Sequence, residues 1–145
     1  MCIRDSARTA GYFGVSRIIL GQEAGAARPG EATYRIAEGG MEAVEIFRVP
    51  DLVKFARELS GAGYSVLGAA TRGGRPEASG GDAPVALVLG NEEHGLSPAM
   101  TTACTRLVTI PGTGRVESLN VSVAAAVLIW ELWGRAPNSR PSRTR

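Results

Sequence analysis

Residues that support several common chemistries are scarce in this sequence. Its 145 residues include two cysteines and one histidine, which is too few for a disulfide framework or a cluster of metal ligands. No N-terminal run is apolar enough for a signal peptide. The most apolar stretch, Val121 to Trp133, is interrupted by Glu131 and is too short to cross a bilayer. We therefore expect a cytoplasmic protein with no metal site and no membrane segment.

Lysine is also scarce, because Lys54 is the only one and arginine carries nearly all the positive charge. Arginine suits bidentate contacts with phosphate groups, although a bias toward GC-rich codons would give the same composition and is the simpler interpretation. The net charge of +2 alone identifies no partner. The length and the 44% hydrophobic content fit a single globular domain.

Apolar segments and turn-forming residues alternate in the order expected of an α/β domain. Strands are predicted at residues 16–20, 44–49, 64–68, 85–89 and 107–110, and helices at 7–13, from 51 to Gly61, at 97–103 and at 119–133. The strand at 85–89 is apolar throughout, as buried parallel strands are. Asp51 is a candidate N-cap. The glycine-rich segments 21–40 and 71–83 are predicted as loops, the second of them flexible.

Both ends of the chain depart from this pattern. A parallel-sheet domain normally opens with a strand, and residues 1–6 (MCIRDS) give no sign of one. We expect the first strand to be missing and these residues to be atypical or foreign to the fold. Residues 7–134 form the predicted domain. Residues 135–145 are rich in arginine and show no periodicity, so they are predicted to be a disordered basic tail.

The final predicted helix, Leu119 to Trp133, is apolar on nearly every side. Such a helix is either central to a core or shared with a partner subunit. In a domain of this size the second alternative has real weight, and the sequence leaves both open.

Two of the predicted strands end in loops that contain glycine. LGNEEHGL at 89–96 follows the fourth strand, and IPGTGR at 110–115 follows the fifth and leads through SLNV into the final helix. Glycine allows a backbone to approach a ligand closely, and ligands of open α/β sheets bind beyond the carboxyl ends of the strands. We therefore predict a ligand site at these loops. Its polar candidates are Glu92, Ser118 and Asn120.

The same loops carry a resemblance to a known family. LVLGNEEHGLS at 87–97 and VTIPGTGRVESLNVSVAAAVLIWE at 108–131 resemble motifs two and three of the SpoU/TrmH-type branch of the SPOUT RNA 2′-O-ribose methyltransferases. Arg8-Thr9-Ala10, followed by Phe13-Gly14-Val15, is similar to the end of motif one. The likeness covers roughly Arg8 to Trp133, and motif three is its most specific part.

This resemblance implies both a fold and a reaction. The fold would be a parallel sheet flanked by helices, with its C-terminal part threaded into a trefoil knot, a feature that is very rare in proteins. The cofactor would be S-adenosyl-L-methionine, and the product a 2′-O-methylated ribose in structured RNA. Ribosomal RNA is favoured over transfer RNA by the form of motif three, GRVESLNVSVA. The working unit would be a homodimer formed through the C-terminal helix.

The resemblance also assigns roles to individual residues. The positions whose backbone would hold the cofactor are Leu89, Gly90, Ile110, Gly114 and Leu119. The catalytic group would be Arg8, Glu92, Ser118 and Asn120. Arg8 and Arg115 would contact RNA, and no metal ligand is implied. Because arginine stays protonated in proteins, Arg8 suits gripping a phosphate and stabilising a developing alkoxide better than acting as a base.

One departure from the family pattern favours an alternative function. Motif one has an asparagine six residues before its arginine, and here that position is Cys2. Together with the missing first strand, this favours a non-catalytic RNA-binding or dimerisation remnant of such an enzyme.

Each polar candidate also has a purely structural interpretation. Ser118 or a neighbour could cap the final helix, and Glu92 could complement a helix dipole. Asn120 falls in the first turn of the predicted helix, where asparagine is a poor helix former, so packing does not explain it. Arg115 could be a solvated surface residue, and His94 is expected to be an exposed loop residue.

Other enzyme classes fit poorly. A dinucleotide-binding enzyme needs G-x-G-x-x-G directly after its first strand, whereas Gly112-Thr113-Gly114 comes late and lacks the third glycine. Gly112 and Gly114 are instead expected to supply unusual backbone angles. A serine hydrolase needs G-x-S-x-G and a partnered histidine, and neither is present.

Overall fold

The computed structural model describes residues 3–21, 44–76 and 81–134. The predicted basic tail at 135–145 and nearly all of the predicted loop at 21–40 lie outside these ranges. Five strands and five helical segments are found in the described residues, in the order expected for an α/β domain.

The strands form two parallel sheets. β1 (Arg17–Gly21) pairs with β2 (Glu45–Val49). β3 (Ser65–Ala69) lies between β4 (Val85–Val88) and β5 (Arg106–Val108), which gives the order β4-β3-β5. All three pairings are parallel, as the continuously apolar sequence of the strand at 85–89 predicts. The predicted parallel sheet flanked by helices is therefore confirmed.

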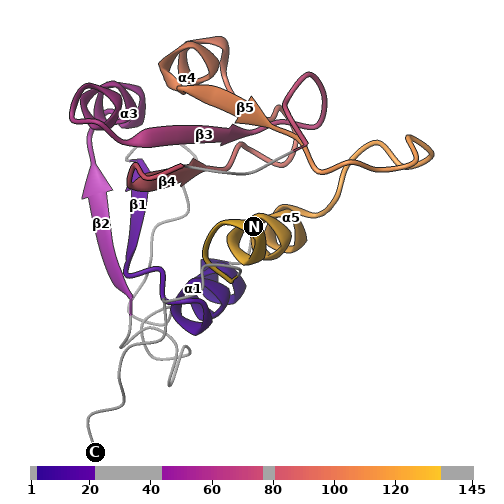
Figure 1. Ribbon diagram of the computed structural model, residues 1–145, viewed down its shortest axis with the longest axis horizontal. Helices are drawn as coiled ribbons and strands as arrows, with labels where there is room; N and C mark the ends of the chain where they lie inside the picture. The colour runs from indigo at the N-terminus through magenta and orange to yellow at the C-terminus, as the bar shows by residue number, and fades with distance from the viewer. Residues whose placement is uncertain (1–2, 22–43, 77–80, 135–145) are drawn as a thin grey trace, which may run out of the picture.

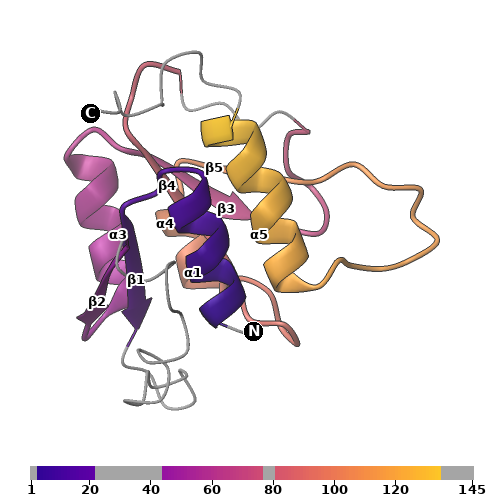
Figure 2. The ribbon, with the colours of Figure 1, turned by 90° about the horizontal axis from the view of Figure 1, so that it is seen from below.

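Helices cover both faces of the strands (Figure 1). α3 (Leu52–Gly61) and α4 (Pro98–Ala103) lie on one side. α1 (Ile3–Tyr12) and α5 (Val121–Ile129) lie side by side on the other, as Figure 2 also shows. α3 and α4 cover one face of β3, α5 packs on the other, and α1 packs against β1 and β2, so the helices and strands form three layers.

Two neighbouring residues of β3 reach the two layers. Val66 packs in a cluster with Ala56 of α3 and Met100 of α4. Leu67 packs with Val108 of β5 and Leu128 of α5. Successive side chains of a strand point to opposite faces, and here both are fully buried. β3 is therefore the centre of the core.

Two helices begin at caps that follow the sequence pattern. The Asp51 side chain accepts a hydrogen bond from the backbone N–H of Lys54 at 2.9 Å. Ser97 accepts one from the N–H of Met100 at 3.1 Å, and Pro98 occupies the first turn of α4. Both bonds satisfy backbone donors that a helix start leaves open. The prediction of Asp51 as an N-cap is confirmed.

The final helix differs from its prediction at both ends. It begins at Val121 rather than Leu119, because Asn120 is its N-cap. Its α-helical part ends at Ile129 and continues as a π-helical turn, η1 (Trp130–Gly134). The ring centroids of Trp130 and Phe13 are 5.7 Å apart, and this contact joins the π-helical turn to the end of α1.

The first helix begins earlier than predicted. α1 starts at Ile3, so residues 3–6 extend the helix predicted from Ala7.

The segment after β3 is more ordered than its composition predicts. Arg75 forms a parallel bridge with Val108, its N–H donating to Leu107 and its carbonyl accepting from Thr109. The Gly74 N–H donates to the Thr109 hydroxyl at 2.9 Å. A Cβ atom on Gly74 would meet that hydroxyl at 2.5 Å, so only glycine fits this crossing. The prediction of a flexible loop is therefore wrong for Gly74 and Arg75, which are hydrogen bonded to β5 and the residue that follows it.

Candidate active site

The carboxyl ends of β3, β4 and β5 open into one cleft of about 1080 Å³. Its walls come from residues 69–72, the turn 89–96, most of the segment 107–119, and Val121, Ala124 and Leu128 of α5. A site at the carboxyl ends of parallel strands is the expected location in an open sheet. The two loops singled out in the sequence therefore line the same cleft, as predicted.

The turn after β4 is closed by hydrogen bonds between its own residues. The N–H of Asn91 donates to the carbonyl of Gly95 at 3.0 Å, and the N–H of Gly95 donates back at 2.8 Å. Inside the turn, the Asn91 side chain accepts from the N–H of Glu93 at 2.8 Å. Gly95 has a φ of 64°, in the region that favours glycine. His94 is exposed in this turn, as predicted.

Gly90 is needed at the start of this turn for a different reason. A Cβ atom there would lie 2.6 Å from both the carbonyl oxygen of Gly95 and the nitrogen of Leu96. The two stretches of backbone are thus in direct contact, which no other residue would permit. Because Gly90 and Gly95 both line the cleft, bare backbone forms part of its wall.

The segment from 111 to 120 is exposed at every residue. Figures 1 and 2 show it extending away from the body of the domain before it enters α5. Gly114 has a φ of 76°, as the sequence predicts, whereas Gly112 does not have a positive φ. The expectation of an unusual backbone angle is therefore confirmed for Gly114 and wrong for Gly112.

The five positions predicted to hold a cofactor share one property. Leu89, Gly90, Ile110, Gly114 and Leu119 all line the cleft. None of their backbone N–H or C=O groups is hydrogen bonded to another residue in the described ranges. Open backbone donors and acceptors along the wall of a cleft suit a ligand that pairs with backbone.

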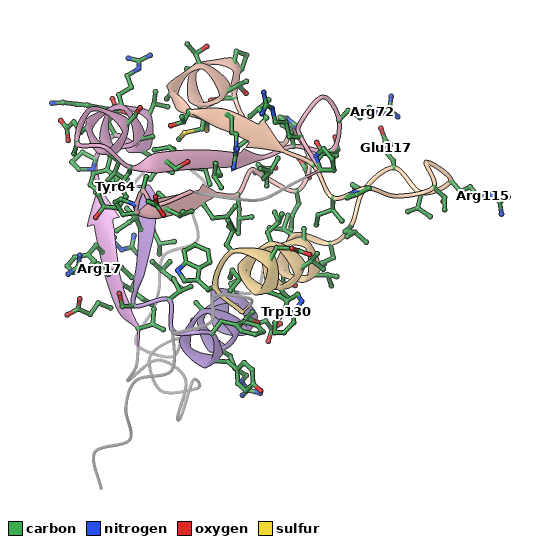
Figure 3. All side chains as sticks on the ribbon, in the orientation of Figure 1. Arg17, Tyr64, Arg72, Arg115, Glu117 and Trp130 are labelled. Atoms are coloured by element: carbon green, nitrogen blue, oxygen red, sulfur yellow. The ribbon has the colours of Figure 1, made fainter. Side chains whose placement is uncertain are left out.

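The charged groups of the cleft are mostly acidic. Among its described lining residues are Glu92, Glu93 and Glu117, opposed by the single arginine Arg72. In Figure 3, Arg72 and Glu117 extend from different loops on the same side of the molecule. A cleft with apolar walls, backbone donors and carboxylates fits a ligand that joins a flat apolar group to a positively charged one.

The structure brings together only part of the predicted catalytic group. Glu92 and Ser118 line the cleft, but Arg8, Asn120 and Arg115 are not among its lining residues. Arg8 is exposed on α1. Arg115 is exposed in the extended segment and donates its backbone N–H to the Thr113 hydroxyl at 3.4 Å.

Asn120 caps the final helix. Its side-chain oxygen accepts from the backbone N–H of Ser122 at 2.9 Å and from the Ser122 hydroxyl at 2.6 Å. The expectation that Ser118 or a neighbour caps the helix is therefore confirmed for the neighbour. The placement of Asn120 in the first turn is wrong, because it stands before the helix. Ser118 is not the cap.

Comparison with known proteins identifies the family. Residues 5–130 match the sequence profile of the SpoU rRNA methylase family. The chain belongs to this family. It is similar to the 23S rRNA (guanosine-2′-O-)-methyltransferase RlmB of Nitrosomonas europaea, with 34% identity over 127 residues that cover 86% of this chain and 48% of the relative. It thus spans about half the length of that relative.

Solved structures of SpoU proteins have the same fold. A TrmH-family protein from Porphyromonas gingivalis superposes with a TM-score of 0.79 at 30% identity, covering 93% of this chain and 55% of the other. An rRNA methyltransferase from Sinorhizobium meliloti, solved with S-adenosylmethionine bound, gives 0.75 at 30% identity, with coverage of 90% and 50%. The resemblance read from motifs two and three is confirmed.

The SpoU cleft contains residues that the sequence interpretation missed. Residues 69–72 at the end of β3 form one of its walls, and Ala124 and Leu128 of α5 form part of another. Residues 69–72 could have been predicted, because ligands bind at the carboxyl ends of strands and β3 is one of these strands. The contribution of Ala124 and Leu128 depends on how α5 packs, which periodicity does not predict.

No helix in the described part of the chain has the length and apolar character needed to cross a membrane. No group of three or more histidine, cysteine, aspartate or glutamate residues in those ranges is placed to hold a metal ion.

Proposed function

We propose that this SpoU-family chain transfers the methyl group of S-adenosyl-L-methionine to a ribose 2′-oxygen in structured RNA, with ribosomal RNA as the favoured substrate. The observation that carries the proposal is the row of unpaired backbone groups at Leu89, Gly90, Ile110, Gly114 and Leu119 around one cleft. The relative from N. europaea is named for 2′-O-methylation of 23S rRNA. An RNA substrate places the proposed reaction in the cytoplasm.

The cleft has features that fit this cofactor. The contact of Gly90 with Gly95 leaves bare backbone in its wall, and Leu89, Ile110 and Leu119 offer apolar surface beside it. Glu92, Glu93 and Glu117 supply negative charge near a group that carries a sulfonium and an ammonium. The backbone donors would pair with the adenine ring, and the carboxylates would lie toward the charged end.

The chemistry of the transfer requires alignment above all. The cofactor supplies a methyl group that is already activated as a sulfonium. The protein must hold the ribose oxygen in line with it, and such alignment accounts for up to about 7–11 kcal/mol of barrier reduction in favourable cases. As the C–O bond forms and the C–S bond breaks, the sulfonium would become a neutral thioether and the hydroxyl proton would pass to solvent water, while the proposed Ser118 and Glu92 lie in the cleft to hydrogen bond around that oxygen.

Arg8 is proposed to act from outside the cleft walls. Its position on an exposed side of α1 suits a contact with an RNA phosphate beside the target nucleotide, where its fixed charge stabilises the developing alkoxide. Arg115 is proposed as a second RNA contact. Asn120 is proposed to serve the reaction indirectly, because its cap on Ser122 fixes the start of α5 next to Ser118.

A homodimer through the C-terminal helix is part of the same proposal. Val123, Val127 and Trp130 are 49%, 37% and 47% exposed. The spacing of these three residues places them along one side of the helix and its last turn, whereas Ala125, Leu128 and Ile129 are buried. Such a stripe of exposed apolar side chains is typical of a surface that a second subunit covers.

A trefoil knot is also proposed, and the course of the chain around β5 supports it. β5 pairs with β3 on one edge, while Arg75, only six residues beyond the end of β3, bridges to Val108. The chain then returns to β4 on the other side of β3. The proposed knot requires the segment that follows β5 to pass through this bend.

Methyl transfer from labelled cofactor to RNA tests the proposal. The purified chain is incubated with S-adenosylmethionine and bacterial ribosomal RNA, and digested nucleosides are examined by mass spectrometry for 2′-O-methylation. Calorimetric titration measures cofactor binding separately. We expect Arg8→Ala to abolish transfer while sparing cofactor affinity, and near-normal transfer by this variant would refute its role.

The position of Arg8 outside the cleft also favours the second candidate function, a non-catalytic RNA-binding or dimerisation remnant. The calorimetric titration distinguishes the two candidate functions by whether the chain binds the cofactor. A catalyst must bind S-adenosylmethionine, whereas RNA binding without any cofactor binding would support the remnant and end the methyltransferase proposal.

A further inference from the structure

Arg72 occupies a distinctive position in the cleft. It follows β3 by three residues and is exposed where the cleft opens. It is the only arginine among the described residues that line the cleft. It makes no ion pair or hydrogen bond with any other residue in the described ranges, so its guanidinium group is available to a ligand.

The backbone that carries Arg72 is held in place on both sides. Before it, the N–H of Ala70 donates to the carbonyl of Val108 at 2.9 Å. After it, Gly74 and Arg75 are fixed to β5 through Thr109 and Leu107. A short segment anchored at both ends presents its side chain from a defined point, which reduces the entropy lost when a ligand is bound.

The acidic residues around Arg72 indicate which kind of ligand this arginine would bind. A nucleic acid that places a ribose in this cleft brings its phosphates toward Glu92, Glu93 and Glu117, and like charges in proximity are costly. Arg72 is the one cation of the described lining that offsets this repulsion. Figure 3 shows it on the same side of the molecule as Arg115 and far from Arg17. The two arginines thus stand on separate loops, and only Arg72 lines the cleft.

We propose that Arg72 binds a phosphate of the RNA backbone next to the target nucleotide and so positions the ribose in the cleft. This inference rests on the proposed function and extends it to a residue outside the three family motifs. Guanidinium groups match phosphate oxygens with two parallel hydrogen bonds. Such a contact positions an RNA without reading its sequence.

Three variants of the full chain test the proposal. Arg72→Gln removes the charge, Arg72→Lys keeps it without the planar fork, and Arg57→Gln is the matched control. Arg57 is an exposed arginine on α3, and Figure 1 shows that helix far from the segment that follows β5. RNA affinity is measured by fluorescence anisotropy with a fluorescein-labelled RNA stem-loop over a range of salt concentrations. Cofactor affinity is measured by calorimetry, and folding by thermal denaturation.

The expected result is specific to RNA. Arg72→Gln should weaken RNA binding about 10-fold, and Arg72→Lys less. The slope of log affinity against log salt should become shallower by about 0.7–0.9, the value for one lost phosphate contact. Cofactor affinity should be unchanged in all variants, and Arg57→Gln should match the wild type in every measurement.

Other outcomes overturn the inference. The inference is wrong if Arg72→Gln has the same RNA affinity and salt slope as Arg57→Gln. It is also wrong if the wild type does not bind RNA. Loss of cofactor affinity in Arg72→Gln would assign the residue to the cofactor instead. Failure of the proposed function would be seen elsewhere, as a wild-type chain that binds RNA but neither binds cofactor nor transfers methyl groups.

Discussion

Gly90 lies against Gly95 backbone to backbone, so that a Cβ atom on Gly90 would stand 2.6 Å from the Gly95 carbonyl oxygen. This contact closes the turn after β4 and forms part of the cleft wall. Its two partners use different properties of glycine: Gly90 has no room for a side chain, and Gly95 has a φ of 64°.

Substituting Gly90 by alanine should destabilise the fold and damage the cleft. The clash is with backbone, which cannot rotate away, so we expect a loss of at least about 2 kcal/mol of unfolding free energy and much weaker cofactor binding. Gly112→Ala is the matched control, because that position has open space and no positive φ; it should stay within about 0.5 kcal/mol of the wild type. Urea denaturation and calorimetry measure both. Equal stability of the two variants would contradict the assigned contact.

Asn120 and Ser118 should respond differently to alanine. Asn120→Ala removes the cap on Ser122 and should cost about 1 kcal/mol of stability, whereas Ser118→Ala should leave thermal stability unchanged and lower methyl transfer. Asn120→Asp keeps a capping oxygen and should retain both stability and transfer. Loss of transfer by a fully stable Asn120→Asp variant would show that the amide itself acts in the reaction.

The exposed stripe of α5 should control assembly. Val127→Glu places a charge in a surface proposed to be buried between subunits, so this variant should be a monomer by light scattering at concentrations where the wild type is a dimer. Thr102→Glu, on an exposed position of α4, should leave assembly unchanged. A wild type that is monomeric at every concentration tested would overturn the dimer.

Cys104 should react slowly in the folded chain. Burial raises the pKa of its thiol, and the sulfur lies so close to Gly68 that a Cβ atom there would meet it at 2.8 Å. Less thiolate means slower alkylation near neutral pH. Because the folded pKa lies above the unfolded one, this thiol favours folding below the ordinary thiol pKa of about 8.5 and loses that contribution as pH rises through the folded value. Iodoacetamide labelling followed by peptide mapping, with and without urea, measures the rate at Cys104; equal rates would contradict its burial.

Local patterns predicted the elements and the site loops well. Alternating apolar runs located all five strands, and Asp51 and Pro98 marked the starts of their helices, because these signals depend on neighbouring residues alone. The start of α5 was placed two residues early, since Ser118 and Asn120 are both good caps and only the fold selects between them. The loop after β3 was misjudged for a similar reason: Gly73 and Gly74 suggest flexibility, but Gly74 lets the chain pass directly against Val108 and Thr109.

The candidate site was predictable where it consists of backbone. Gly90, Gly95 and Gly114 are glycines, a residue type that indicates close backbone contacts or a positive φ. The resemblance to the family motifs then predicted that these loops hold a cofactor. The charges around the cleft were harder to predict from the sequence, because whether Arg72 or Arg8 faces the ligand depends on how distant segments pack. Local patterns do not show which way an arginine side chain points.

The ten consecutive exposed residues from 111 to 120 have a consequence for handling the protein. Arg115 sits at the middle of this stretch and offers trypsin an accessible bond, and a nick there would cut α5 off from the strands that precede it. A bound cofactor or RNA that draws this segment inward would shield the bond, so the rate of tryptic cleavage reports occupancy of the cleft without any label.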